Sequence, residues 1–209
     1  NQPTMTIAST TSGVSDGSKT NDATIALTFT SSEATTNFAE SDISVSGGSL
    51  SDFTGVSSTL YTATFTPSGD GATTVDVGAS FTDATGNANT AANQFNWEYD
   101  GTAPTMTIQA AEVSDGGTSN DATLSMTFTS SEATTNFVLS DISVSGGSLS
   151  NFNAVSSTVY TAVFTPTTDG ATTINVAAGG FTDAVGNTNS AATEFNWVYD
   201  STALTITIA

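Results

Sequence analysis

The chain has 209 residues and a formal net charge of −19, because 20 Asp and Glu residues are balanced by a single base, Lys19. It contains no His and no Cys, which excludes disulfides, thiolate or imidazole metal ligands, and catalysis by Ser-His or Cys-His pairs. Nucleic-acid binding is excluded because almost nothing could neutralise phosphates, and no apolar run is long enough to span a membrane.

Alternating apolar and polar residues predict short β-strands along the first half of the chain. Such alternation gives each strand one buried and one solvated face. The alternating segments, in chain order, start at Met5 and continue at 23–30, 43–45, 61–66, 72–78 and 95–99. Turn residues separate them, as at Gly47-Gly48, 67–71 and Gly86-Asn87. The pattern predicts an all-β chain of immunoglobulin-like sandwiches, with about seven strands each and a core held by packing alone.

Long internal repeats divide the chain into two units and part of a third. Residues 20–38 return at 119–137, residues 81–87 at 181–187, and residues 94–108 at 194–208. The predicted domains are repeat 1 at 1–99, repeat 2 at 100–199, and a linker with the first strand of a third repeat at 200–209. No signal peptide is recognisable, so we expect a mature or internal fragment of a longer array.

The last segment, Ser201 to Ala209, reads as an apolar strand. Leu204, Ile206 and Ile208 alternate with threonine, although Leu204 stands where the repeat pattern has Pro104. An exposed apolar strand tends to pair its backbone with another strand. We therefore expect a partner to hold it, either a further repeat or the sheet edge of a neighbouring chain.

The order of the motifs resembles a known family. SEATTNF, SDISVSGGSLSDF, YTATFTPSGDGATTVDV, FTDATGN and YDGTAPT follow one another as in the bacterial Ig-like repeats of very large surface and secreted adhesins. The resemblance covers both units. It implies a secreted or cell-surface stalk, often stiffened by calcium and exported without disulfides, whose partners are the neighbouring repeats of the same chain.

Strand tracing places several carboxylates at one pole of each unit. In an antiparallel sandwich, the loops at 31–36 and 82–93 lie at the N-terminal pole, and the corresponding pole of repeat 2 faces the linker. These residues offer only oxygen ligands, the kind that Ca²⁺ prefers. The predicted junction calcium site comprises Asp100, Glu132, Asp183 and Asn187. The equivalent site of repeat 1 comprises Glu33, Asp83 and Asn87, and a weaker cluster at the opposite pole comprises Asp16, Asp22 and Asp70.

Simpler explanations exist for each of these motifs. An aspartate in D-x-x-G-N accepts local backbone N–H bonds and forms turns without any metal. Phe95, Trp97 and Tyr99 share one strand face, which favours a core position over sugar stacking. The threonine arrays are ordinary exposed strand residues, which disfavours ice binding, and paired carboxylates in turns make a poor glycosidase site.

Together these features predict a non-enzymatic extracellular spacer stiffened by Ca²⁺. The alternatives are a self-assembling filament or sheath, in which residues 201–209 are donated as a strand to another copy, and a glycan-binding module.

Overall fold

The computed structural model describes residues 1–208 and divides them into two compact units, here called unit 1 (Asn1–Thr102) and unit 2 (from Ala103 onward). The division falls close to the boundary that the repeat spacing predicts. Each unit is built from β-strands, and its helical content is one turn of 3-10 helix. Among the residues described, no helix has the length and apolar character needed to cross a membrane.

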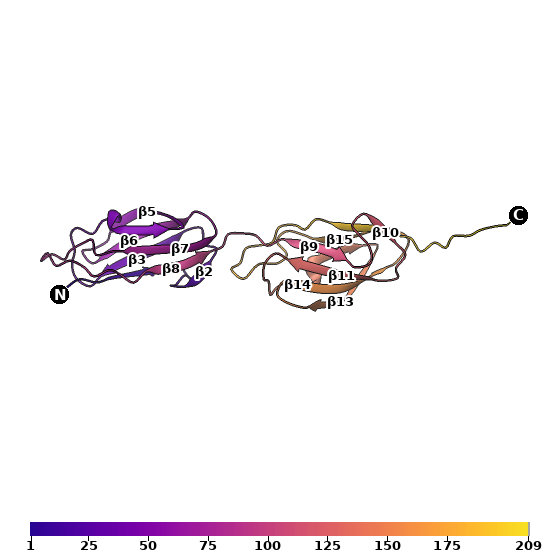
Figure 1. Ribbon diagram of the computed structural model, residues 1–209, viewed down its shortest axis with the longest axis horizontal. Helices are drawn as coiled ribbons and strands as arrows, with labels where there is room; N and C mark the ends of the chain where they lie inside the picture. The colour runs from indigo at the N-terminus through magenta and orange to yellow at the C-terminus, as the bar shows by residue number, and fades with distance from the viewer. Residues whose placement is uncertain (209) are drawn as a thin grey trace. The chain divides into compact units, whose positions relative to one another are not determined.

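Both units contain the same succession of elements (Figure 1). Those of unit 1 are β1 (Met5–Ser9), β2 (Ser18–Thr20), β3 (Ile25–Ser31), η1 (Glu40–Asp42), β4 (Ile43–Ser46), β5 (Gly48–Gly55), β6 (Leu60–Pro67), β7 (Gly71–Val77) and β8 (Phe95–Tyr99). Those of unit 2 are β9 (Met106–Ala110), β10 (Gly117–Ser119), β11 (Leu124–Ser130), η2 (Leu139–Asp141), β12 (Ile142–Ser145), β13 (Gly147–Ala154), β14 (Val159–Pro166), β15 (Gly170–Val176) and β16 (Phe195–Tyr199).

Each unit is a sandwich of two four-stranded sheets. In unit 1 the strand orders are β1-β3-β6-β5 and β2-β8-β7-β4; in unit 2 they are β9-β11-β14-β13 and β10-β16-β15-β12. Neighbouring strands are antiparallel except β2 with β8 and β10 with β16, which are parallel. The all-β, immunoglobulin-like fold predicted from the alternation is confirmed.

The structure has eight strands per unit rather than about seven. The additional strand of unit 1, β2, is only three residues long and carries no apolar alternation, so periodicity could not reveal it. It forms where the chain leaves the sheet of β1 and crosses to the other sheet. Gly17 N–H donates to Asn96 O (2.7 Å), and the Asp16 carboxylate accepts the Asn96 N–H (2.8 Å), which fixes the crossing.

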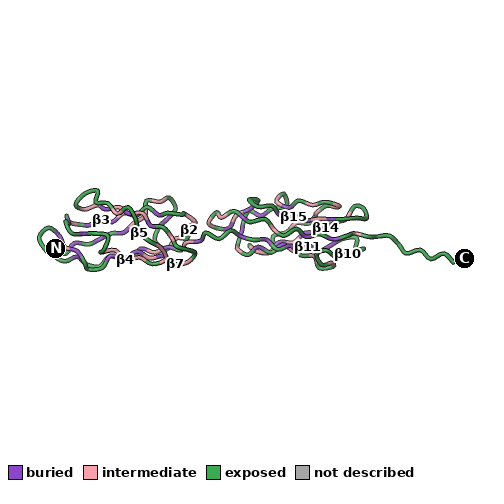
Figure 2. The backbone as a smooth tube through the Cα atoms, turned by 90° about the horizontal axis from the view of Figure 1, so that it is seen from above, coloured by how far each residue is buried: buried purple, intermediate pink, exposed green. Residues whose placement is uncertain are grey.

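Aromatic side chains fill the space between the sheets. In unit 1, Phe29 and Phe65 are fully buried and Trp97 is nearly so. The Phe65 and Trp97 rings meet edge to face with centroids 4.7 Å apart, a geometry that adds stability beyond the buried area. Figure 2 shows the buried segments inside each unit and exposed backbone around them. The predicted core role of Phe95 and Trp97 is confirmed, while Tyr99 is half-buried.

The expectation that a further repeat or a neighbouring chain holds residues 201–209 stays a prediction, because it concerns a partner outside residues 1–208. Residues 201–208 form no strand and are exposed, with Leu204 and Ile208 more than nine-tenths accessible; Ala209 lies outside the described residues. Strand structure requires backbone pairing with a neighbour. Ser201 and Thr202 bond to Asp169, but the segment beyond them pairs with no strand among residues 1–208.

The predicted Gly47-Gly48 turn joins β4 to β5, and Gly48 is packed too closely for a side chain. A Cβ at Gly48 would lie 2.4 Å from Thr66 O and 2.5 Å from the Phe65 ring. We expect Gly48→Ala to reduce the free energy of unfolding of unit 1 by about 1–3 kcal/mol, the usual cost of overpacking.

Denaturant unfolding followed by tryptophan fluorescence measures this effect, since each unit contains one tryptophan. Gly78→Ala is the control, because a Cβ there meets nothing within 4 Å, and its effect should stay within about 0.5 kcal/mol. Equal stability of the two variants would contradict the packing argument.

Candidate metal centre

Two loops of unit 2 carry the predicted ligands Glu132 and Asp183, and a single asparagine joins these loops. Asn136 Nδ2 donates to Thr182 Oγ1 (3.2 Å), and Thr182 N–H donates back to Asn136 Oδ1 (3.0 Å). The loop of Glu132 is also tied to the core, because the buried Tyr160 hydroxyl donates to Thr134 O (2.8 Å). Contacts between residues far apart in sequence therefore fix both loops at one pole of the sandwich.

The carboxylates of Glu132 and Asp183 lie close together at this pole. Each offers an oxygen within 4.8 Å of the other, with Asp183 buried and Glu132 half-buried. Two negative charges at this separation repel each other by an amount on the order of 1 kcal/mol even in water, and by more where water is partly excluded. The pair is therefore a candidate cation site.

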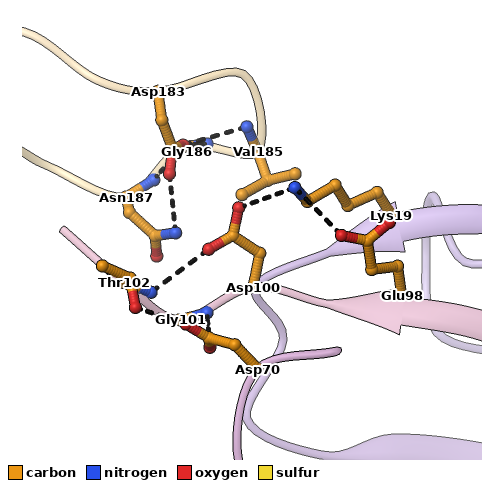
Figure 3. Close-up of polar contacts among 10 residues, drawn as sticks. All are labelled: Lys19, Asp70, Glu98, Asp100, Gly101, Thr102, Asp183, Val185, Gly186 and Asn187. Carbon is orange, nitrogen blue, oxygen red and sulfur yellow. Dashed lines mark hydrogen bonds and ion pairs between the residues drawn. The ribbon is translucent and has the colours of Figure 1, made fainter. Parts of the chain in front are cut away.

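The Asp183 carboxylate also organises its own turn (Figure 3). Oδ1 accepts the backbone N–H groups of Val185, Gly186 and Asn187 at 2.8–2.9 Å, and Oδ2 accepts the Asn187 side-chain amide at 2.8 Å. The turn-forming role expected of the D-x-x-G-N motif is thus present. It leaves the carboxylate rigidly oriented, and the amide of Asn187 occupies one of its oxygens.

Unit 1 repeats this turn around Asp83. Asn87 Nδ2 donates to Asp83 Oδ2 (2.8 Å), and the backbone N–H groups of Thr85 and Asn87 donate to Oδ1. The hydrogen bond from the Asn87 side chain, with further bonds from Thr85, holds the pKa of Asp83 well below its usual range. Thr35 pairs with Asp83 in an isolated bridge, which brings the loop of the half-buried Glu33 beside this turn.

Asp100, the fourth predicted ligand, ends the last strand of unit 1 and is buried. Its Oδ1 accepts the Thr102 N–H (3.3 Å), and its Oδ2 lies 3.0 Å from Lys19 Nζ. Lys19 also contacts Glu98 Oε1 at 3.3 Å, so it bridges a carboxylate of β8 and the one that follows this strand (Figure 3). The sequence analysis assigned no role to Lys19. The feature that could have singled it out is that it is the only basic residue in the sequence.

The weaker predicted cluster of Asp16, Asp22 and Asp70 is not gathered at one point. Asp16 binds Asn96, Asp22 accepts the Thr20 hydroxyl, and Asp70 binds the linker. In the range 1–208, these three carboxylates are not among the acidic groups that converge on a common centre. A shared ion there remains a prediction without support from this geometry.

Asp70 instead fastens the end of unit 1. It accepts the Gly101 N–H at 2.6 Å and the Thr102 hydroxyl, and these bonds lower its pKa, the Thr102 bond most strongly. Asp169 does the same in unit 2, where the N–H and hydroxyl of Ser201 and the hydroxyl of Thr202 donate to it. We call this arrangement the exit clasp: Asp70 with residues 101–102, and Asp169 with residues 201–202.

The hollows found among residues 1–208 are not lined by Glu132 or Asp183, although one of about 600 Å³ adjoins the Glu132 loop at Thr134 and Thr135. A hollow of about 520 Å³ in unit 2 runs along β9 and is lined by residues 107–115 and Phe195. Glu132 and Asp183 do not line it. The carboxylate pair therefore belongs to a loop pole rather than to a cleft suited to a substrate.

Comparison with known proteins places both units in one family of domains. The family model described as the bacterial Ig-like domain matches residues 1–99 and again residues 100–199. No curated protein matches the chain.

Among solved structures, the Escherichia coli adhesin FdeC has a TM-score of 0.48 at 18% identity, covering 92% of this chain and 63% of that one. Yersinia pseudotuberculosis InvD has a TM-score of 0.40 at 18% identity, covering 97% of this chain and 60% of its own. Invasin, an integrin-binding bacterial protein, has a TM-score of 0.42 at 18% identity and covers 82% of this chain and 36% of its own. The chain spans less than two thirds of each of these structures, and the likeness concerns the fold alone.

The exit clasp should protect backbone amides without any metal. We expect Asp70→Asn to speed hydrogen exchange at the Gly101 amide, and Asp169→Asn to do so at Ser201, because each change weakens a charged acceptor. Each variant is the control for the other unit. Unchanged exchange at Gly101 in Asp70→Asn would rule out the clasp.

The lowered pKa of Asp83 predicts a pH-dependent contribution to stability. The unfolded carboxyl has a pKa near 3.8, and the folded one lies lower. The stabilisation is therefore complete above pH 3.8 and is lost as the pH falls through the folded pKa. We expect the difference in unfolding free energy between the native chain and Asp83→Asn to be steady near neutrality and to shrink in acid.

Urea unfolding of both proteins across this pH range tests the prediction. The other carboxylates are common to the two proteins, so the relief of general charge repulsion in acid cancels in the difference. A difference that stays constant down to strongly acidic pH would show that the ionised form of Asp83 gives no advantage.

Proposed function

The chain belongs to the bacterial Ig-like domain family, with one copy of the domain in each unit, and we propose that it works as a non-enzymatic spacer of a surface adhesin. Each unit has a complete buried core of its own, as a load-bearing repeat requires. A secreted or cell-surface location suits a chain without cysteine whose excess of acidic residues keeps it soluble in salty surroundings.

We further propose that Ca²⁺ binds the pole of unit 2 through Glu132 and Asp183. The observation that carries this proposal is the approach of these two carboxylates within 4.8 Å on loops joined by Asn136. The donors are oxygens, which suits a hard cation. A bound cation would relieve the repulsion between the two carboxylates. The hydrogen bonds of the turn around Asp183 do not relieve it.

The chain that enters unit 2 is tied to the same pole as these two carboxylates. Pro104 O accepts the Ser190 N–H. Thr105, the next residue, accepts the Ser131 N–H with its carbonyl and donates its own N–H to Ser131 Oγ, and Ser131 is the neighbour of Glu132.

The turn around Asp183 also fits an ion. Oδ1 is fixed by three backbone N–H groups, while Oδ2 accepts the Asn187 amide. An arriving cation would replace that amide hydrogen bond, and rotation of the Asn187 side chain would then present its own oxygen as a ligand. Without metal, the Asn187 side chain would stabilise the turn as a hydrogen-bond donor; with metal, it would coordinate the ion through its oxygen.

Calcium should raise the melting temperature of the chain and EDTA should lower it. Binding to the native state adds about 2.7 kcal/mol at one hundred times Kd. Glu132→Gln should remove most of the calcium-dependent shift, because it removes a ligand charge and leaves the Asp183 turn intact. Glu40→Gln is the control, since it makes the same charge change at an exposed residue of η1. An identical melt in EDTA and in calcium at low salt would refute the proposal.

A filament subunit is the second candidate. Leu204, Ile206 and Ile208 are 82–93% exposed and alternate with threonine, the pattern of a strand that could be donated to another copy. Small-angle scattering on the same samples separates the candidates. A spacer keeps its monomer mass at all concentrations, whereas a filament gains mass with concentration.

A further inference from the structure

The outer edge of β9 in unit 2 pairs with no other strand among residues 1–208. β9 is the last strand of its sheet, next to β11. Ala111 N–H donates to Ser125 O, and in an antiparallel pair every second residue bonds to the partner strand. Ile108 and Ala110 therefore turn their backbone N–H and C=O groups away from β11, where a further strand could bind them.

The other three sheet edges of unit 2 are short or bent. β10 has three residues and β12 has four, and β13 contains a bulge between Ser150 and Asn153. Short strands and bulges keep an edge from pairing with another chain. β9 has five residues, pairs with β11 without a bulge and carries no charge.

The hollow of about 520 Å³ lies beside this edge and has an apolar part, made by the buried Ile108 and Phe195 and the half-buried Val113. Alternate side chains of a strand added to β9 would point toward it. Free backbone groups beside a pocket for alternate side chains are what recognition by strand addition requires.

The segment that follows the first strand is shorter in unit 2, residues 109–114, than in unit 1, residues 8–15. Val14 of the longer segment is buried in the core of unit 1. The hollow beside β1 measures about 180 Å³; unit 2 has its counterpart, of about 130 Å³, and the larger hollow in addition. The shorter segment therefore leaves the edge of β9 more open.

Acidic side chains line both hollows, and unit 2 contains no basic residue. Glu112 and Asp115 line the larger hollow, and Glu194 lines the smaller one. Glu112 is held in place because it accepts the Ser125 N–H at 2.8 Å. The charge at this edge therefore complements a basic segment and repels a second copy of this chain, whose net charge is −19.

We infer that the β9 edge of unit 2 is a docking site for an extended, basic segment of another protein, in which apolar residues alternate with Lys or Arg. The segment adds a fifth strand to the sheet of β9, its apolar side chains fill the hollow, and its bases offset the charges of Glu112 and Asp115. The inference goes beyond the spacer function and does not depend on calcium. It gives the stalk a lateral attachment point in one of its two repeats.

Amide NMR of the whole chain tests the inference, with a capped synthetic peptide of alternating Val and Lys as the probe. In the free chain, the Ile108 amide should exchange more than about tenfold faster than the Gln109 amide, which faces β11. At about 0.01 M salt, where screening is weak, the peptide should slow exchange at Ile108 and leave Ile7 of unit 1 unchanged. A matched peptide of Val and Glu should give no protection.

Two variants separate charge from shape. Glu112→Gln should raise the Kd of the Val-Lys peptide by about two- to fivefold, the worth of one exposed charge pair, whereas Glu40→Gln makes the same charge change in unit 1 and should not. A chimera with residues 8–15 in place of 109–114 should lose the binding. A thermal melt shows whether the chimera folds; if it does not, the Glu112→Gln variant and the Val-Glu peptide decide the outcome.

Three results would overturn the inference. The first is a Val-Lys peptide that protects no amide of β9, and the second is equal binding of the two peptides. The third is a dimer of the native chain that protects Ile108 and is lost when residues 201–209 are deleted, because the edge would then belong to a second copy.

Discussion

Hydrogen bonds from backbone N–H groups to aspartate carboxylates hold the loops of this protein, and most of its other features depend on them. Asp83 and Asp183 each organise a turn, Asp16 fixes the crossing between sheets, and Asp70 fastens the exit of unit 1. Ionised acceptors make stronger hydrogen bonds than neutral ones. The chain can therefore order long loops without disulfides. The aspartates that do so contribute to its large negative charge.

Comparison of the two units separates structural acids from adjustable ones. Most of the acids shared by both units bind backbone groups; Asp42 and Asp141, for example, each accept the N–H three residues earlier. Some acids found in one unit instead bind side chains at the surface. Asp76 accepts the Gln94 amide in unit 1, whereas in unit 2 the acid and the amide have changed places, with Asn175 donating to Glu194. Unit 1 has eleven acids and one base, and unit 2 has nine acids and no base.

Local periodicity predicted what depends on local sequence. Alternation located the long strands and the buried faces of Phe95 and Trp97, and the repeats located both units. Asn136 and Thr182 join two loops although they lie 46 positions apart in the sequence. No local pattern in either loop predicts this contact. The ion pairs of Lys19 likewise depend on the parallel register of β2 with β8. Residues 201–208 carry the alternation of a strand but form none among the described residues, because a strand also needs a neighbouring strand to pair with.

The isolation of Lys19 has a consequence for how this protein meets proteases. Trypsin-like enzymes bind a basic side chain in their specificity pocket, and this chain offers them one basic residue in 209. That residue lies in a paired strand with its ammonium bound to two carboxylates, far from the extended, accessible backbone that cleavage requires. A stalk built from such repeats would offer trypsin-like proteases almost no site to cut.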